Sequence, residues 1–160
     1  MQNILVTGGA GFIGSNLVKE LLKDKENKVF VFDNLSTGKL KNLPINHSSL
    51  KFYNIELLID FNDWPIIKNL NYIYHFAANA DVRGGVENRD IDLKQNILVT
   101  KSICDYARVN SCKHLVFASS ATVYGEPEIF PTPENSPLKQ TSVYGASKLA
   151  GEAYIQAYSE

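Results

Sequence analysis

The chain has 160 residues, of which 44% are hydrophobic and 21% are charged, and its formal net charge at pH 7 is −1. This composition is typical of a globular protein and gives no support to binding of nucleic acid or of a membrane surface, because both favour a strongly basic chain. No apolar run approaches the ~20 residues that cross a bilayer, and we expect no signal peptide because a strand pattern begins at once.

A glycine-rich turn stands between the first predicted strand and the first predicted helix. The apolar run Ile4–Val6 is short enough for a buried strand, and the apolar residues of 16–22 recur at helical spacing. The stretch Gly8–Gly14 between them contains the spacing G-x-G-x-x-G. Such glycines let backbone N–H groups approach a pyrophosphate at the start of a helix. They can also serve only the close packing of a helix on a strand, so the turn alone does not establish that a dinucleotide binds.

An acidic residue ends the second predicted strand. This strand, Lys28–Phe32, leads into Asp33, which lies nineteen residues after Gly14. A carboxylate at about this distance from the glycines typically binds the ribose hydroxyls of adenosine. It would repel a 2′-phosphate, and no arginine follows nearby, so we expect NAD rather than NADP. An aspartate after a strand can also be a simple turn former, but its spacing from the glycines favours the ribose contact.

Strand patterns and helix patterns alternate through the rest of the chain, which is typical of a parallel sheet with helices on both faces. We predict a third strand at Leu50–Ile55, a short helix at Asp60–Leu70 that is interrupted near Pro65, a fourth strand at Tyr72–Phe76, a helix over 88–110, a fifth strand at His114–Ala118 and a last helix at Ser142–Ser159. We expect His75 to be a packed structural residue. The fold class is therefore α/β, a doubly wound parallel sheet of the Rossmann type.

The long predicted helix over 88–110 has two features of interest. Its apolar residues can share much of one face at helical spacing, namely Ile91, Leu98, Ile103 and Ala107. Asn96 lies within the pattern, and its amide is either solvated or hydrogen-bonded to a buried partner.

The two cysteines, Cys104 and Cys112, lack the spacing of metal ligands. Reduced thiols are usual in the cytoplasm, whereas disulfides belong to oxidising compartments. We therefore expect two reduced thiols, no metal site and a cytoplasmic protein; a disulfide between the two is the alternative.

A tyrosine and a lysine share one side of the last predicted helix. Tyr144 and Lys148 are four residues apart, while Ser119 and Ser120 follow the fifth strand, at the edge where open α/β sheets bind ligands. A tyrosine beside a cation, with a hydroxyl donor opposite, can take a proton from a sugar alcohol, since the ammonium favours the phenolate. Pairs of this spacing are also common on solvated helix faces, so the interpretation depends on its context.

Five motifs in the same order resemble those of the extended short-chain dehydrogenase/reductases, and within them the NAD-dependent nucleotide-sugar epimerase/dehydratases. The resemblance covers all 160 residues and rests on Thr7–Gly14, Asp33–Gly38, His75–Ala78, Ser119–Gly125 and Tyr144–Lys148.

The resemblance implies a role for each matching residue. It assigns NAD contacts to Gly8, Gly11, Phe12, Ile13, Gly14, Asp33, Asn34, Glu56, Ala77, Ala78, Asn96, Ser119, Tyr144 and Lys148. It assigns catalysis to Ser120, to Tyr144 as the base and to Lys148 as the lysine that activates it. Lys148 would also bind the nicotinamide ribose.

Two departures from the family pattern limit the roles that the resemblance implies. Relatives have Gly-Asp-Leu after the third strand, whereas this chain has Ile55-Glu56-Leu57, so the contact of Glu56 with adenine is less firmly implied. Relatives that dehydrate sugars carry an Asp-Glu pair after the catalytic serine or threonine, and this chain has Ala121 and Thr122 there. Without that pair no proton donor is evident for eliminating water, so we do not expect a 4,6-dehydratase.

The resemblance implies a UDP-sugar 4-epimerase acting on UDP-glucose and UDP-galactose through transient oxidation at C4, as a homodimer through the helices at 88–110 and 142–159. Alternatives are a sugar-nucleotide dehydrogenase/reductase or a uronate epimerase of the same family and, from another class, a non-catalytic dinucleotide-binding fragment. Family members continue well beyond this length. We therefore expect 1–160 to be an incomplete NAD-binding domain that lacks the substrate domain and is inactive alone.

Overall fold

The computed structural model describes residues 1–83, 88 and 90–160 of the chain. These residues form two compact units. The first unit comprises Met1–Ala77 and Ser102–Ala118, and the second comprises Ala78–Lys101 and Ser119–Glu160. The first unit contains the whole sheet, and the second contains the predicted catalytic residues.

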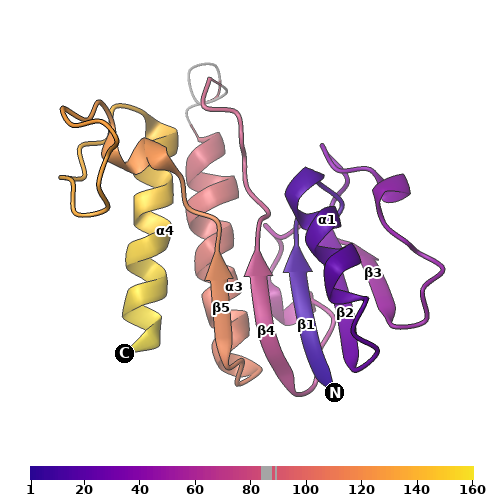
Figure 1. The fold of residues 1–160 in the computed structure, drawn as a ribbon. Helices are drawn as coiled ribbons and strands as arrows, with labels where there is room; N and C mark the ends of the chain where they lie inside the picture. The colour runs from indigo at the N-terminus through magenta and orange to yellow at the C-terminus, as the bar shows by residue number, and fades with distance from the viewer. Residues whose placement is uncertain (84–87, 89) are drawn as a thin grey trace. The chain divides into compact units, whose positions relative to one another are not determined.

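Five parallel strands make the sheet of the first unit, in the order β3-β2-β1-β4-β5 (Figure 1). The strands are β1 (Gln2–Thr7), β2 (Asn27–Asp33), β3 (Leu50–Asn54), β4 (Leu70–His75) and β5 (His114–Phe117). This order confirms the doubly wound, Rossmann-type sheet predicted from the sequence. The chain reverses its direction of winding between β1 and β4, and ligands of such sheets bind at the carboxyl ends of the strands beside this point.

The strand bounds differ from the predicted ones by one or two residues, but the predicted helix at Asp60–Leu70 is wrong. Only one 3-10 turn forms, η2 (Phe61–Asp63), and the Asp60 carboxylate caps it by accepting the N–H of Asn62 at 3.0 Å. Trp64 then takes an extended backbone, with ψ of 152°, because the following Pro65 disfavours the helical conformation of the residue before it.

One face of the sheet is covered by α1 (Phe12–Leu21). Alternate strand residues such as Val6 and Val31 point toward this face, and both are fully buried against Val18 of the helix. A second, shorter helix on this side, η1 (Leu40–Asn42), follows β2. Strands that are buried on both faces appear in a sequence as continuous apolar runs, so this packing explains why the strands could be predicted from the sequence.

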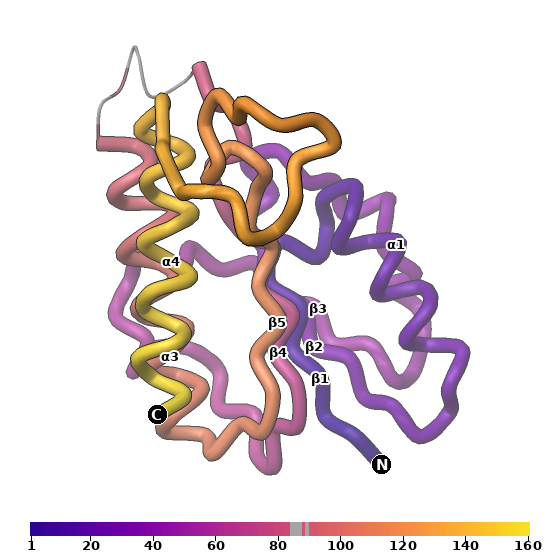
Figure 2. The backbone as a smooth tube through the Cα atoms, turned by 60° about the vertical axis from the view of Figure 1, so that its left-hand side comes forward, coloured from indigo at the N-terminus to yellow at the C-terminus, as the bar shows by residue number. Residues whose placement is uncertain are grey.

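The opposite face of the sheet packs against an aromatic cluster and α3 (Val99–Val109), of which all but the first three residues belong to the first unit. Figure 2 shows α1 and α3 on opposite sides of the strands. The Phe32 ring lies 6.1 Å from that of Trp64, which lies 5.4 Å from that of Tyr106 on α3. The Tyr106 hydroxyl donates a hydrogen bond of 2.6 Å to the Pro65 carbonyl.

The second unit contains the start of the long predicted helix and the last helix. The chain is helical from residue 91, and residue 89 of the predicted range lies outside the described residues. Before α3 it forms a π-helix, η3 (Leu93–Leu98). A π turn adds one residue per turn and so shifts the buried face. Leu98 is consequently 46% exposed, contrary to the shared face predicted for it, while Asn96 and Val99 are buried.

The last helix, α4 (Val143–Ser159), begins as predicted, because the Ser142 hydroxyl accepts the N–H of Gly145 at 3.0 Å. It packs against η3 and against the 3-10 helix η4 (Ala121–Tyr124). Among the helices of the described residues, none is long and apolar enough to cross a membrane. Both cysteines are free thiols, and burial raises the pKa of the Cys104 thiol to about 11.

The buried hydroxyl of Tyr106 predicts a loss of stability at alkaline pH. Burial raises the pKa of Tyr106 to about 12, so the hydroxyl stabilises the folded state fully below the ordinary tyrosine pKa near 10 and loses this effect as the pH rises through 12. Tyr106→Phe should lower the free energy of unfolding by about 1 kcal/mol at pH 7. Between pH 10 and 12, the free energy of unfolding should fall less in this variant than in the unmodified chain. Urea unfolding at each pH measures this. An equal fall of the unfolding free energy with pH in both proteins would contradict the prediction.

Candidate functional site

The glycine-rich loop after β1 forms the backbone surface at the start of α1. The Gly8 carbonyl accepts the N–H of Gly11 at 3.1 Å, and a Cβ on Gly14 would lie only 2.4 Å from the same carbonyl oxygen. No side chain of the described residues caps α1, whose first residues, Phe12 and Ile13, are 84% and 62% exposed. The first N–H groups of a helix have no partner within it, so this surface can receive a phosphate.

The carboxylate of Asp33 holds this loop in place. Its Oδ2 accepts the Ala10 N–H at 2.9 Å, its Oδ1 accepts the Leu35 N–H at 2.8 Å, and the residue is only 7% exposed. Each carboxylate oxygen has a further lone pair, so both can still accept a hydrogen bond from a hydroxyl. Sequence reasoning predicted a ligand contact for Asp33 and missed this second role in fixing the loop.

Asn34 and Glu56, predicted separately, lie together. The Asn34 amide donates to the Glu56 carboxylate at 2.8 Å, and the other carboxylate oxygen accepts the Leu58 N–H at 3.2 Å. The structure therefore joins the end of β2 to the segment after β3. Glu56 has an anchoring function here despite the absence of the family's glycine before it.

The end of β4 meets the start of the glycine-rich loop. The Thr7 hydroxyl lies 2.7 Å from Nδ1 of His75 and accepts the Ala77 N–H at 3.3 Å. His75 is 1% exposed, which fits the structural role expected for it. A Cβ on Gly8 would lie 2.7 Å from the Ala77 nitrogen, so these two predicted residues are in direct backbone contact.

In the second unit, the two serines after β5 have separate partners. The Ser120 hydroxyl caps η4, accepting the N–H of Thr122 at 3.3 Å and its hydroxyl at 3.0 Å. Ser119 donates a hydrogen bond to the carboxylate of Glu152 on α4. Glu152 was not among the predicted residues, although it lies one helical turn beyond Lys148.

Tyr144 and Lys148 share a face of α4, as their spacing predicts. The Lys148 ammonium lies 5.8 Å from the centre of the Tyr144 ring. Lys148 is only 4% exposed, and this burial lowers the pKa of its ammonium to about 8, while the negative charge of Asp92 acts in the opposite direction. Because it is buried, this ammonium interacts more strongly with neighbouring charged or polar groups than an ammonium in water does.

Asn96 is the centre of a buried polar network in the second unit. Its Oδ1 accepts the Asn79 N–H at 2.8 Å, and its amide donates to Asp92 at 3.1 Å and to the Ser147 hydroxyl at 2.8 Å. Ser147 in turn donates to the Tyr144 carbonyl at 2.7 Å. Sequence reasoning identified Asn96 but missed these partners; the spacing of four between Asp92 and Asn96 was an available signal.

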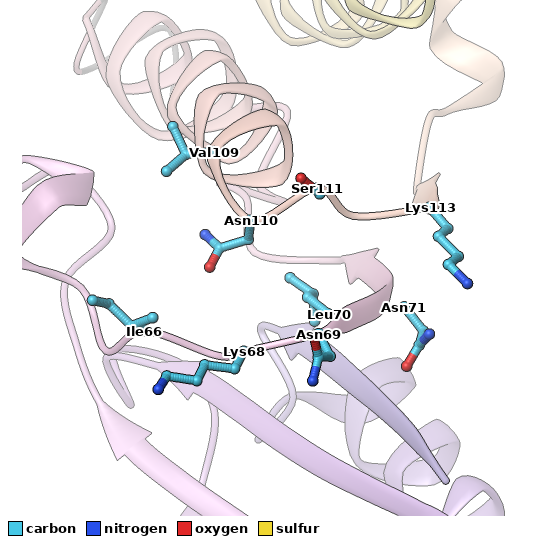
Figure 3. Close-up of a pocket in the computed structure, with 9 residues that line it drawn as sticks. All are labelled: Ile66, Lys68, Asn69, Leu70, Asn71, Val109, Asn110, Ser111 and Lys113. Carbon is cyan, nitrogen blue, oxygen red and sulfur yellow. The ribbon is translucent and has the colours of Figure 1, made fainter.

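A cavity of about 510 Å³ is lined by none of the predicted residues, and Figure 3 shows the residues that line it. It is formed by the segment before and at the start of β4 and by the turn between α3 and β5, with Lys68, Asn69, Asn110 and Ser111 among its lining residues. This is the amino-terminal edge of the strands, whereas ligands of such sheets bind at the carboxyl edge. The described residues also contain no group of three His, Cys, Asp or Glu side chains that could hold a metal ion.

Comparison with known proteins agrees with this geometry. The NAD dependent epimerase/dehydratase family matches residues 4–160. The chain belongs to this family. A putative UDP-glucose 4-epimerase of Methanocaldococcus jannaschii is 40% identical over 158 residues, which are 98% of this chain and 50% of that protein.

Solved structures of the family superpose on the chain. The UDP-glucose 4-epimerase of Thermus thermophilus, in complex with NAD, has a TM-score of 0.86 at 36% identity, with 98% of this chain and 50% of that one covered. The UDP-N-acetylglucosamine 4-epimerase of Methanobrevibacter ruminantium M1, in complex with UDP-N-acetylmuramic acid, has a TM-score of 0.89 at 36% identity, with the same coverage of 98% and 50%. The chain spans about half the length of the relatives it matches.

The contact between η4 and α4 leaves no room for a side chain at residue 145. A Cβ on Gly145 would lie 2.6 Å from the Thr122 carbonyl oxygen. Gly145→Ala should therefore lower the unfolding free energy by about 1–3 kcal/mol, although alanine is the better helix former. Ala146→Ser, at the exposed next position, should change it by less than about 0.5 kcal/mol in the same denaturant series. Unchanged or increased stability of Gly145→Ala would contradict the close contact.

Proposed function

We propose that this chain is the NAD-binding part of a nucleotide-sugar 4-epimerase that interconverts UDP-glucose and UDP-galactose. The observation that carries the proposal is the buried Lys148 beside Tyr144, in a chain of this family whose glycine-rich loop is open to a phosphate. The 4-epimerase relatives, one of them in complex with NAD, support it. On this proposal, residues 1–160 are one incomplete NAD-binding domain.

The residues of the first unit fit NAD. The uncapped start of α1 suits a pyrophosphate, with backbone contacts from Phe12 and Ile13, and Gly14 lets the loop backbone pack closely on the helix. Asp33 would accept the ribose hydroxyls with its remaining lone pairs and would repel the 2′-phosphate of NADP. Asn34, Glu56, Ala77 and Ala78 are the other proposed contacts, with Asn96, Ser119, Tyr144 and Lys148 in the second unit. When bound, NAD would supply the hydride acceptor.

Tyr144 would act as the base in this reaction. On this proposal the phenolate of Tyr144 takes the proton of the sugar's 4-hydroxyl as hydride leaves C4, with the Lys148 ammonium near its ring. Ser120 already accepts two hydrogen bonds from Thr122, so its own proton can be donated to the sugar oxygen. The resulting 4-keto sugar would rotate in the site and receive the hydride on its other face, and Tyr144 would return the proton.

Other members of the same family remain alternatives, namely a sugar-nucleotide dehydrogenase/reductase or a uronate epimerase. A dehydrogenase converts added NAD to NADH, whereas an epimerase leaves no net NADH. A homodimer through the helices at 88–110 and 142–159 is part of the proposal. The exposed Leu93 and Leu98 on η3 and Tyr154 and Tyr158 on α4 support it, because apolar side chains of this kind are suited to an interface.

The ribose contact of Asp33 can be tested by titration. Asp33→Asn keeps the shape of the side chain but replaces one acceptor oxygen by a donor that would face a backbone N–H. We expect NAD affinity to fall at least about tenfold, a loss of about 1.4 kcal/mol, as measured by calorimetry. Asp24→Asn is the matched control, because Asp24 accepts one backbone N–H in an exposed turn and should leave affinity unchanged. Equal affinities for both variants would contradict the assignment.

The catalytic base can be tested in the protein with all the sequence that its gene encodes. Incubation with UDP-galactose should yield UDP-glucose without net NADH, and Tyr144→Phe should lower kcat by about 100-fold or more. Tyr72→Phe, in β4 beside the first residue of β5, is the control and should retain full turnover. Unchanged turnover of Tyr144→Phe would refute the mechanism, and product analysis with other UDP-sugars would correct the substrate.

A further inference from the structure

Asp92 carries a buried carboxylate for which the proposed reaction has no role. The residue is 0% exposed and stands immediately before η3. Its Oδ1 accepts hydrogen bonds from the side-chain amides of Asn79 at 2.9 Å and Asn96 at 3.1 Å. Its Oδ2 has no hydrogen-bond partner among the described residues. Burying an ionised carboxylate is strongly unfavourable unless hydrogen bonds and an opposite charge compensate it, and the two neutral amides provide only part of this.

The opposite charge is on α4. The negative charge of Asp92 favours the ammonium form of Lys148 against the effect of its burial. The two elements that pack most extensively against α4 are η3 and η4, and their other titratable groups are Lys94 on η3 and Tyr124 on η4.

These other groups have partners of their own. Lys94 pairs with Asp90 at the surface, at 3.6 Å, and the Tyr124 hydroxyl donates to the Glu134 carbonyl at 3.4 Å. On α4 itself, the carboxylate of Glu152 accepts the hydrogen bond of Ser119. Among these groups, Asp92 is the carboxylate whose negative charge acts on Lys148.

We propose that Asp92 is a positioning residue for the Tyr144–Lys148 pair, whose buried carboxylate keeps the Lys148 ammonium charged and fixes the amide that anchors the start of α4. The catalytic consequence rests on the proposed epimerase function, whereas the electrostatic part concerns the folded chain alone.

The hydrogen bonds of Asp92 fix the orientation of the Asn96 side-chain amide. Because the carboxylate can only accept, the Asn96 side chain must turn its NH₂ toward Asp92 and its oxygen toward the Asn79 N–H. In this orientation the same NH₂ donates to Ser147, whose hydroxyl donates to the Tyr144 carbonyl at 2.7 Å. The orientation set at Asp92 is thus transmitted to the backbone of the residue proposed as the base.

Replacing Asp92 by asparagine removes the negative charge and keeps the shape of the side chain, so the effect of the charge can be measured apart from that of packing. In Asp92→Asn the Lys148 ammonium loses its counter-charge but stays buried, so the midpoint of its titration should fall by about one pH unit or more from its value of about 8. The measurement is NMR of the lysine side-chain Cε carbon in ¹³C-labelled whole protein, with the Lys148 signal assigned by its loss in Lys148→Met.

Asp90→Asn is the matched control. Asp90 lies two residues before Asp92, and its substitution removes the same charge from a side chain that is 65% exposed and pairs with Lys94. The Lys148 midpoint should stay unchanged in this variant. Should Asp92→Asn fail to fold, Asp92→Ser keeps an oxygen acceptor in a smaller volume and serves the same comparison. A Lys148 midpoint that is equal in the Asp92 and Asp90 variants would overturn the proposal.

A second measurement reports on catalysis. If Lys148 must be charged, the alkaline limb of the kcat–pH profile should move to lower pH in Asp92→Asn by the same amount as the NMR midpoint, and should not move in Asp90→Asn. A purely structural role would lower kcat without moving this limb, and that result would also overturn the proposal. If the unmodified protein converts no UDP-sugar, the proposed function fails, and the NMR titration still decides whether Asp92 is the counter-charge.

Discussion

The carboxylate of Asp33 connects the sheet to the loop that would meet a ligand. It is buried at the end of β2, and its two oxygens accept the N–H groups of Ala10 and Leu35 at 2.9 and 2.8 Å. Backbone donors on both oxygens make this burial favourable, and they fix the loop between β1 and α1 without covering it. Because the loop is already ordered, a dinucleotide would not have to order it on binding, and this preorganisation saves free energy of association. A single side chain thus serves both the fold and the proposed binding of NAD.

The second unit uses buried charge differently. Lys148 and Asp92 are 4% and 0% exposed, and one Asp92 oxygen has no hydrogen-bond partner among the described residues. Replacing such groups by apolar ones is often neutral or stabilising, so their presence is a poor argument for stability. Charged groups with perturbed pKa values cluster where proteins do chemistry, and the lowered pKa of Lys148 beside Tyr144 fits that rule.

Much of the fold could be predicted from the sequence, because strands buried on both faces appear as short apolar runs and the glycines mark the turn after β1. The two failures have local causes. The helix predicted at Asp60–Leu70 is prevented where Trp64 becomes extended before Pro65. The face predicted for Leu98 is shifted by a π turn, which a helical period of 3.6 residues cannot reveal. Spacing predicted Tyr144 and Lys148, and the family resemblance predicted Asn96, but neither predicted the partners of Asn96, because polar residues on a helix are usually solvated.

The composition of α4 explains why those partners matter. Its buried residues are Gly145, Ser147, Lys148 and Gly151, which are small or polar. Without a large apolar side chain, the helix cannot be located by packing alone, which is nondirectional. Hydrogen bonds require a defined distance and angle, so the bond that Ser147 accepts from Asn96 helps to set its position and rotation. A helix held this way gains little stability but presents Tyr144 and Lys148 in one orientation, which the proposed proton transfer requires.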